Sequence, residues 1–241
     1  MPTRLCLHTV IPVLVVIVAI VSEYSGLDLW LAGHFYDSAS RSWPYRDRFL
    51  TSTLLHTGGK YLVAFIALTN ILAILGSFVA KPLAPYRKDF IYILVAALTG
   101  IAVVAALKDL THIYVPWDLR IFGGDRPYVR LFDAPVAGEP VGHGFPGGHS
   151  SGGFGYLSLY FALMLHGHRY RYRALALALA LGVSFSIAQQ LRGAHFLSHD
   201  MFSFVVCWTS ALLWALAFYP RQWFWAKGRN KGPETNGEHS R

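Results

Sequence analysis

The sequence predicts an all-α, polytopic membrane protein, a bundle of six transmembrane helices. The chain is 54% hydrophobic and only 14% charged, whereas a soluble domain carries about 25% charged residues. Six stretches approach the length of about 20 apolar residues that a bilayer-spanning helix needs. The formal net charge of +8 lies in short Lys and Arg clusters between these stretches. This arrangement suits membrane topology and anionic lipid head groups, so we expect a lipid bilayer and no nucleic acid as partner.

The six apolar segments divide the chain almost from end to end. They run from Leu5 to Val21, Tyr61 to Ala80, Phe90 to Leu107, Ser151 to Leu165, Ala174 to Gln189 and Met201 to Tyr219. Pro12 predicts a kink in the first segment, and the fourth is short, with glycines at its start. We expect residues 1–227 to form one membrane domain. Residues 228–241 are polar and lack apolar periodicity, which predicts a disordered cytoplasmic tail.

The charges of the connections predict the topology. Basic residues mark the short connections after the second and fourth segments and the chain after the sixth: Lys81, Arg87, Lys88, Arg169, Arg171, Arg173, Arg221, Lys227, Arg229 and Lys231. Short loops rich in Lys and Arg stay in the cytoplasm, so we expect both termini there. The connections 22–60, 109–150 and 190–200 then face outward. The first of them holds Leu27–Ala32 and Trp43, which we interpret as an amphipathic surface segment with interfacial tryptophans.

The start of the fourth segment is a candidate anion site. The stretch Pro146–Ser150 contains two glycines that remove side chains near a bound ligand, and the first N–H groups of a helix have no partner within the helix. Gly148 and Ser150 are therefore expected to contact phosphate, and His149 to donate a proton to a leaving oxygen. The alternative is an interfacial helix cap with an incidental histidine.

A second polar group lies between the fifth and sixth segments and contains Arg192, His195, His199 and Asp200. A neutral imidazole can attack phosphorus, and a carboxylate on its other nitrogen fixes the tautomer. Asp200, or a water held by His199, could do this for His195. The alternatives are His199 as the nucleophile, or a solvated polar loop. Ionisable residues at membrane depth are costly, and this favours function.

Three cations at the start of the second outer connection and within it complete the candidate site. Lys108 ends the third segment, and Arg120 and Arg126 follow it. Cations around a transferring phosphoryl group stabilise its oxygens, and an arginine can bind two of them. The alternatives are that Lys108 anchors its helix at the interface and that Arg120 simply pairs with Asp118.

These stretches resemble the three signatures of the type 2 phosphatidic acid phosphatase superfamily. The resemblance is carried by Lys108, Arg126-Pro127, Pro146–His149 and Gly193–Ser198. It implies a membrane phosphatase that needs no metal or other cofactor and acts on a lipid phosphate. By resemblance, His195 attacks phosphorus and forms a phosphohistidine, and His149 protonates the leaving group. It also implies a cell-membrane enzyme, in the bacterial inner membrane, with its site facing the periplasm or exterior.

The chain departs from the superfamily pattern at four points. The stretch from Lys108 to Arg126 is longer than in the pattern, and Gly147 replaces a serine. With His195 aligned, Gln189 falls at the arginine position and His199 at the aspartate position. We expect Arg192 and Asp200 to take over those roles. A lipid phosphotransferase with the same site, a lipid-binding or transport protein and a structural membrane subunit are the other hypotheses.

Overall fold

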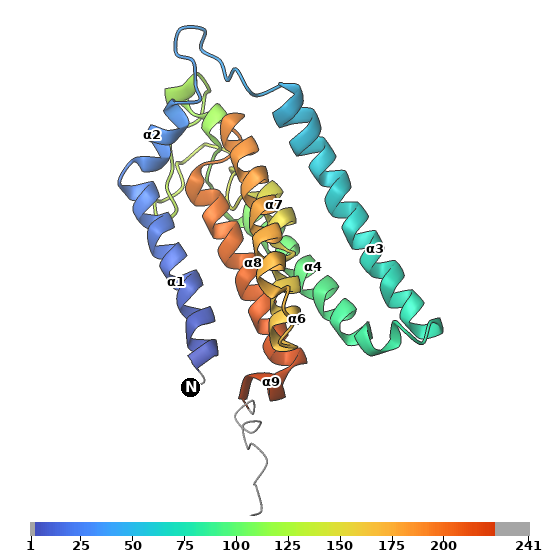
Figure 1. Ribbon diagram of the computed structural model, residues 1–241. Coiled ribbons are helices and arrows are strands. Elements are labelled where there is room, and N and C mark those ends of the chain that lie inside the picture. The colour runs from blue at the N-terminus through green and yellow to red at the C-terminus, as the bar shows by residue number, and fades with distance from the viewer. Residues whose placement is uncertain (1–2, 225–241) are drawn as a thin grey trace, which may run out of the picture.

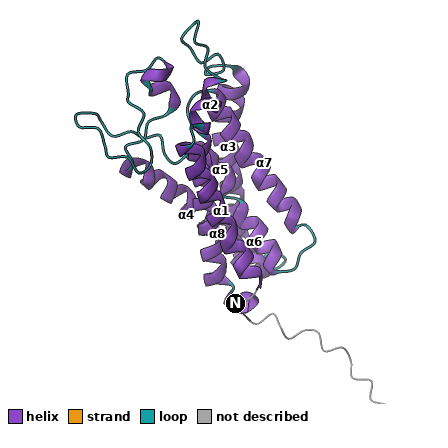
Figure 2. Ribbon diagram, turned by 90° about the vertical axis from the view of Figure 1, so that its left-hand side faces the viewer, coloured by secondary structure: helices purple, strands orange, loops and turns teal. Residues whose placement is uncertain are grey.

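The computed structural model describes residues 3–224, which contain helices and no strand (Figures 1 and 2). The tail predicted at 228–241 lies outside the described residues. The longer elements are α1 (Thr3–Tyr24), η1 (Phe49–Gly58, a π-helix), α3 (Gly59–Val79), α4 (Arg87–Leu110), α7 (Arg171–Leu191) and α8 (Leu197–Phe218). The shorter helices are α2 (Leu27–Gly33), α5 (Gly148–Phe154), α6 (Leu157–Leu165) and α9 (Pro220–Phe224). The 3₁₀ turns are η2 (Ala84–Tyr86), η3 (Pro116–Asp118) and η4 (Arg120–Phe122).

Helix α8 forms the centre of the bundle and contacts α1, α4, α5 and α6. Its buried face belongs to the main hydrophobic core, and two polar bonds lock neighbouring helices to it. The Tyr92 hydroxyl of α4 donates to the Ala211 carbonyl (2.9 Å), and the Trp208 indole donates to the His8 carbonyl of α1 (2.9 Å). Satisfied polar groups inside an apolar core hold helices in one register.

Five helical stretches of the described chain are long and apolar enough to cross a membrane, not six. The predicted fourth segment is divided into α5 and α6 at Gly155-Tyr156. Here the Tyr156 N–H bonds to the Gly153 carbonyl, a tighter turn than an α-helix makes. Gly152, Gly153 and Gly155 lie together at this point, and glycine is a poor helix former.

The second segment begins earlier than predicted, because η1 and α3 form one continuous helical stretch over Phe49–Val79. The outer connection is therefore shorter than 22–60. Only 6% of the most apolar window of this stretch is buried. Figure 1 shows α3 leaning away from α1 and α8, which leaves most of its surface for lipid.

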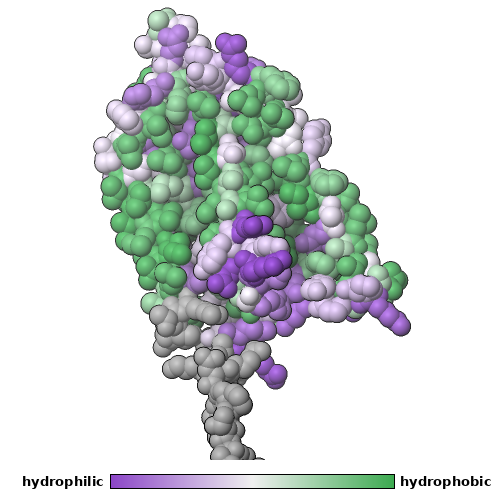
Figure 3. Space-filling view, viewed as in Figure 1, coloured by the Kyte–Doolittle hydropathy of each residue, from purple (hydrophilic) through white to green (hydrophobic). Residues whose placement is uncertain are grey.

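On the face seen in Figure 3, apolar side chains cover a broad band of the bundle, and polar residues gather towards both ends. Exposed residues of this band include Leu14 and Val18 of α1, Leu68 and Leu72 of α3, and Leu177 of α7. The N-terminus and α9 lie at one end, and the loops before η1 and after α4 lie at the other (Figure 1). This arrangement is that of a multi-pass membrane protein.

The loops at the end of the bundle opposite the start of α1 fold, together with α2, into a small second core. Ala32, Trp43, Tyr114, Leu119, Phe122, Val129 and Phe196 are its buried members. Trp43 is 8% exposed and packs on Gly193, so it is not an interfacial tryptophan as predicted. Trp30 of α2 is 61% exposed, in line with an amphipathic segment there. Of the residues between Lys108 and Arg126, Tyr114, Leu119 and Phe122 belong to this core, and Trp117 packs against it.

Candidate active site

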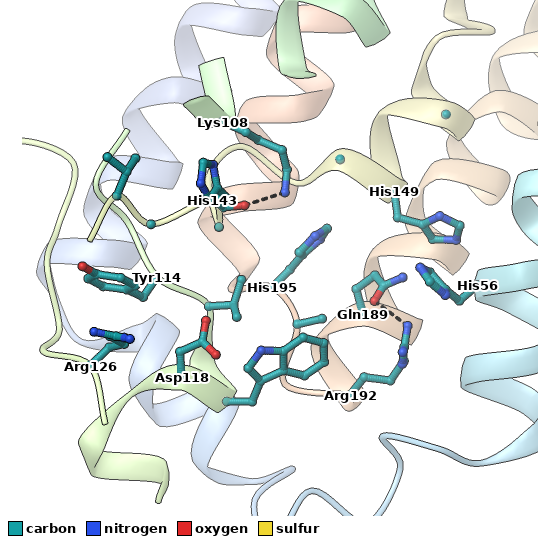
Figure 4. A pocket seen from close by; sticks show the side chains of 18 of the residues that line it. His56, Lys108, Tyr114, Asp118, Arg126, His143, His149, Gln189, Arg192 and His195 are labelled. Atoms are coloured by element: carbon teal, nitrogen blue, oxygen red, sulfur yellow. Dashed lines mark hydrogen bonds between the residues drawn. The ribbon is translucent and has the colours of Figure 1, made fainter. Parts of the chain in front are cut away.

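A cavity of about 820 Å³ opens where the loop after α4 meets the helices of the bundle (Figure 4). Its charged and titratable lining residues are His56, Lys60, Lys108, Tyr114, Asp118, Asp125, Arg126, His143, His149, Arg192 and His195. The tertiary structure thus brings together residues that lie far apart in the sequence. Lys108, Arg126, Gly148, His149, Arg192 and His195 were predicted from the sequence, and all of them line this cavity.

His195 and Asp200 form a buried hydrogen-bonded pair. His195 Nδ1 lies 2.8 Å from Asp200 Oδ1, and their side chains are 7% and 3% exposed. The other carboxylate oxygen accepts a bond of 3.0 Å from the Gln190 amide. Because an ionised carboxylate only accepts, Nδ1 carries the hydrogen and Nε2 keeps its lone pair. The hydrogen bond fixes the orientation of the imidazole, and His195 lines the cavity.

The local fold explains how this pair is positioned. Helix α7 ends at Leu191, and Gly193 adopts a left-handed conformation (φ +74°) that turns the chain towards α8. The Gly193 carbonyl accepts from the Trp117 N–H at 2.9 Å, which ties this turn to the preceding outer loop. Asp200 lies in the first turn of α8. His195 is therefore placed between two helix ends that the core holds rigidly.

Gly147 is explained by the same pair. A Cβ at this position would lie 2.4 Å from Asp200 Oδ1 and 2.8 Å from His195 Nδ1. The space that a serine would occupy is taken by the His195–Asp200 hydrogen bond. A serine at position 147 is therefore incompatible with the present geometry of the His195–Asp200 pair.

His149 lies in the first turn of α5, outside the five candidate spanning helices. Its Nε2 lies 2.8 Å from the Leu55 carbonyl of η1, and since a carbonyl only accepts, Nε2 is the donor. In the neutral ring Nδ1 therefore keeps a lone pair, and it carries a transferable proton only when the imidazole is protonated. Burial lowers the pKa of His149 to about 4; the hydrogen bond to the Leu55 carbonyl opposes this shift, and the charges of Lys60 and Arg192 add to it. An anion in the cavity reverses this charge effect and favours the protonated, donating form.

Lys108 and Arg192 are the best-placed cations for a phosphate. The Lys108 ammonium donates to the His143 carbonyl at 2.8 Å. The Lys108 side chain packs closely on Gly148, where an added Cβ would lie 3.1 Å from Lys108 Cε. Arg192 donates to the Gln189 amide oxygen (3.0 Å) and to the Arg46 carbonyl (2.9 Å), with no carboxylate partner among the described residues. The contact joins Arg192 to Gln189, the residue at the arginine position of the superfamily pattern. Since α5 has only seven residues, its dipole adds less than the sequence suggested.

Arg126 lines the cavity but is already paired. Its guanidinium contacts Glu139 at 2.8 Å and Asp125 at 3.3 Å. Arg120 does not line the cavity, its side chain is 65% exposed, and it pairs with Glu139 and not with Asp118. Of these two arginines, only Arg126 lines the cavity, and an anionic ligand would have to compete with Glu139 for its guanidinium.

Two of the candidate residues lie behind the cavity wall. The Ser150 hydroxyl is fully buried and donates to the Gly147 carbonyl at 2.9 Å, so it does not face a ligand. His199 is 1% exposed, does not line the cavity and packs against Phe145 and Phe196. The geometry therefore favours His195 over His199 as the nucleophile.

His56 and Lys60 are cavity residues that the sequence reasoning missed, because they were assigned to an outer loop. The His56 ring lies 4.9 Å from that of His149, between centroids. The usable signal was their spacing of four residues, which places both on one face of a helix.

The PAP2 superfamily model matches residues 89–223, more than half of the chain. The chain therefore belongs to the PAP2 superfamily, which supports phosphatase activity on phosphate esters. The matched segment includes Lys108, His149, His195 and Asp200 and excludes His56 and Lys60. No curated protein and no solved structure matches the chain.

Proposed function

We propose that this protein is an integral-membrane lipid phosphate phosphatase that hydrolyses a phosphomonoester or diphosphate through a phosphohistidine on His195. The observation that carries the proposal is the buried His195–Asp200 pair, which faces a cavity shared with His149, Lys108 and Arg192. A neutral imidazole, a proton donor and two cations are the groups that phosphoryl transfer to a protein nucleophile requires.

The reaction proceeds in two steps. His195 Nε2 attacks phosphorus while Lys108, Arg192 and the Gly148 backbone stabilise the equatorial oxygens. The leaving oxygen takes the bonding electron pair and the proton from His149 Nδ1. Water then attacks the phosphohistidine and returns a proton to His149, and phosphate departs. Asp200 stabilises the imidazolium-like state of His195 in both steps.

A groove beside the cavity supports a lipid substrate. It has a volume of about 240 Å³ and lies between α3 and α4, with mostly apolar walls. Lys60, Val63 and Ile101 line both the groove and the cavity, so the two spaces adjoin. A hydrocarbon chain in this groove would stay at membrane depth while its phosphate reaches His195.

We also propose that the site faces the exterior or periplasm and that both termini are cytoplasmic. The support is the cluster of basic residues at the end that holds the N-terminus, including Lys81, Arg169 and Arg171. Reporter fusions after residue 35 and after residue 168 test this orientation, since the first should be external and the second internal.

The decisive experiment measures phosphate release from a panel of lipid phosphates by purified protein in detergent, with chelator present. His195→Ala should lower kcat by about 10³-fold or more, as expected for loss of a covalent nucleophile. Wild-type protein given ³²P-labelled substrate and quenched in base should carry label that His195→Ala does not. His34→Ala, an exposed histidine of the α2 end, is the matched control. Activity of His195→Ala at the wild-type level would refute the proposal, whereas label transferred to a second lipid would define a phosphotransferase.

A further inference from the structure

The charges of the cavity are distributed unevenly. On the side of the outer loop, Asp118 and Asp125 line the wall, and Arg126 is neutralised by Asp125 and Glu139. Figure 4 shows Asp118 and Arg126 on one side of His195, and His56, His149 and Arg192 together on the other. In a substrate with more than one phosphate, the carboxylates on the loop side repel the second phosphate, and the basic groups on the side of η1 and α3 attract it.

The junction of η1 and α3 is built against the proton donor. Leu55 accepts from His149, the His56 ring lies 4.9 Å from the His149 ring, and a Cβ on Gly59 would lie 3.2 Å from the same imidazole. Lys60 follows directly and lines the cavity without a hydrogen bond or ion pair to any residue that the structure describes. Lys60 is thus an unpaired cation close to His149, the proposed proton donor to the leaving oxygen. In this position it can bind a leaving group that carries negative charge.

We propose that His56 and Lys60 form a second anion subsite, which holds the inner phosphate of a lipid diphosphate while His195 attacks the outer phosphorus. This inference rests on the proposed function. In an in-line displacement the leaving oxygen lies opposite the attacking Nε2, and the structure supplies His149 as its proton donor. The leaving group of a diphosphate is itself a phosphate ester, whereas that of a monoester is an uncharged alcohol with nothing for Lys60 to bind.

The order of the spaces matches such a substrate. The cavity with His195 takes the outer phosphate, Lys60 stands at its border, and the apolar groove between α3 and α4 begins at Lys60, Val63 and Ile101. A lipid diphosphate presents its outer phosphate, inner phosphate and hydrocarbon chain in the same order.

The step is balanced without a further reactant. The bond between the outer phosphorus and the bridging oxygen breaks, and a bond from His195 Nε2 to that phosphorus forms. The lipid monophosphate leaves with the electron pair and a proton from His149. Water then cleaves the phosphorus–nitrogen bond, which yields inorganic phosphate and restores both histidines.

Farnesyl diphosphate and farnesyl phosphate test the inference, because they share one chain and differ by one phosphate. Wild-type protein should prefer the diphosphate, and Lys60→Met should lower the ratio of the two kcat/KM values about tenfold or more, since the lost cation acts on a charge developing in the transition state. Lys60→Arg should restore much of the ratio, and His56→Gln should lower it to a smaller extent. Lys81→Met, at the far end of α3, is the matched control and should leave the ratio unchanged.

The outcomes distinguish failure of the second anion subsite from failure of the proposed phosphatase function. Equal losses on both probes in Lys60→Met and His56→Gln, or a wild-type preference for the monophosphate, would overturn the second subsite and leave the phosphatase standing. Absence of phosphate release from both probes and from the lipid panel would overturn the proposed function and this inference with it.

Discussion

Gly147→Ser, which introduces the serine of the superfamily pattern, should lower the activity of this protein about 10²-fold. Gly147 has φ −67° and ψ 106°, a backbone conformation that any residue adopts, so Gly147→Ser meets only a steric obstacle. Its Cβ would lie 2.4 Å from Asp200 Oδ1, where ordinary contact begins at 3.4 Å. The backbone cannot yield easily, because the Gly147 N–H donates to His199 (3.0 Å) and its carbonyl accepts from Ser150 (2.9 Å) and Ser203 (2.7 Å).

The carboxylate must therefore retreat by about 1 Å, and displacements of that size cost catalytic steps about 10²-fold. We expect kcat of Gly147→Ser to fall by about this factor, with a smaller change in KM, because the cations that bind phosphate are untouched. Phosphate release in detergent measures both constants, and the thermal unfolding midpoint reports folding. Gly33→Ser, which meets open space, is the control. A folded Gly147→Ser protein with wild-type kcat would refute the role assigned to the His195–Asp200 pair.

Three further predictions follow from buried or paired charges. Asp28→Ala should destabilise the protein by about 3 kcal/mol, because Ser22 (2.8 Å) and the Ser198 N–H (3.1 Å) and hydroxyl lose a buried acceptor; denaturation that matches wild type would contradict this. Glu139→Gln should lower KM by up to about fivefold by releasing Arg126 from an ion pair worth at most about 1 kcal/mol; a raised KM would count against a phosphate contact. Because burial lowers the pKa of His149 to about 4, the unfolded chain binds more protons below pH 6.5, so stability should fall as the pH drops towards 4. The thermal unfolding midpoint measured across this pH range checks the prediction. Orthovanadate, an anion that resembles phosphate, should reduce the fall in the midpoint, and the midpoint of His149→Gln should fall less than that of the wild type.

The helical class and the membrane setting could be predicted from the sequence because both depend on local composition. A run such as Ala174–Gln189 is apolar over most of its length, and this run lies within α7. The prediction failed for the fourth segment, since hydropathy averages over Gly152, Gly153 and Gly155 and does not register the turn that divides α5 from α6. It also failed before Lys60, where η1 carries polar residues that resemble a loop.

The sequence by itself determined which chemical groups the protein has and roughly where along the chain they lie: His149, His195, Asp200, Lys108 and Arg192, each near a predicted helix end. Only the tertiary structure decided which of them meet. It pairs Asp200 with His195, places His199 and Ser150 behind the wall, and engages Arg126 with Glu139. The physical reason is that helix ends separated by tens of residues are brought together by packing in the core. A shift of one residue rotates a side chain by about 100° around a helix, which moves it from cavity to core.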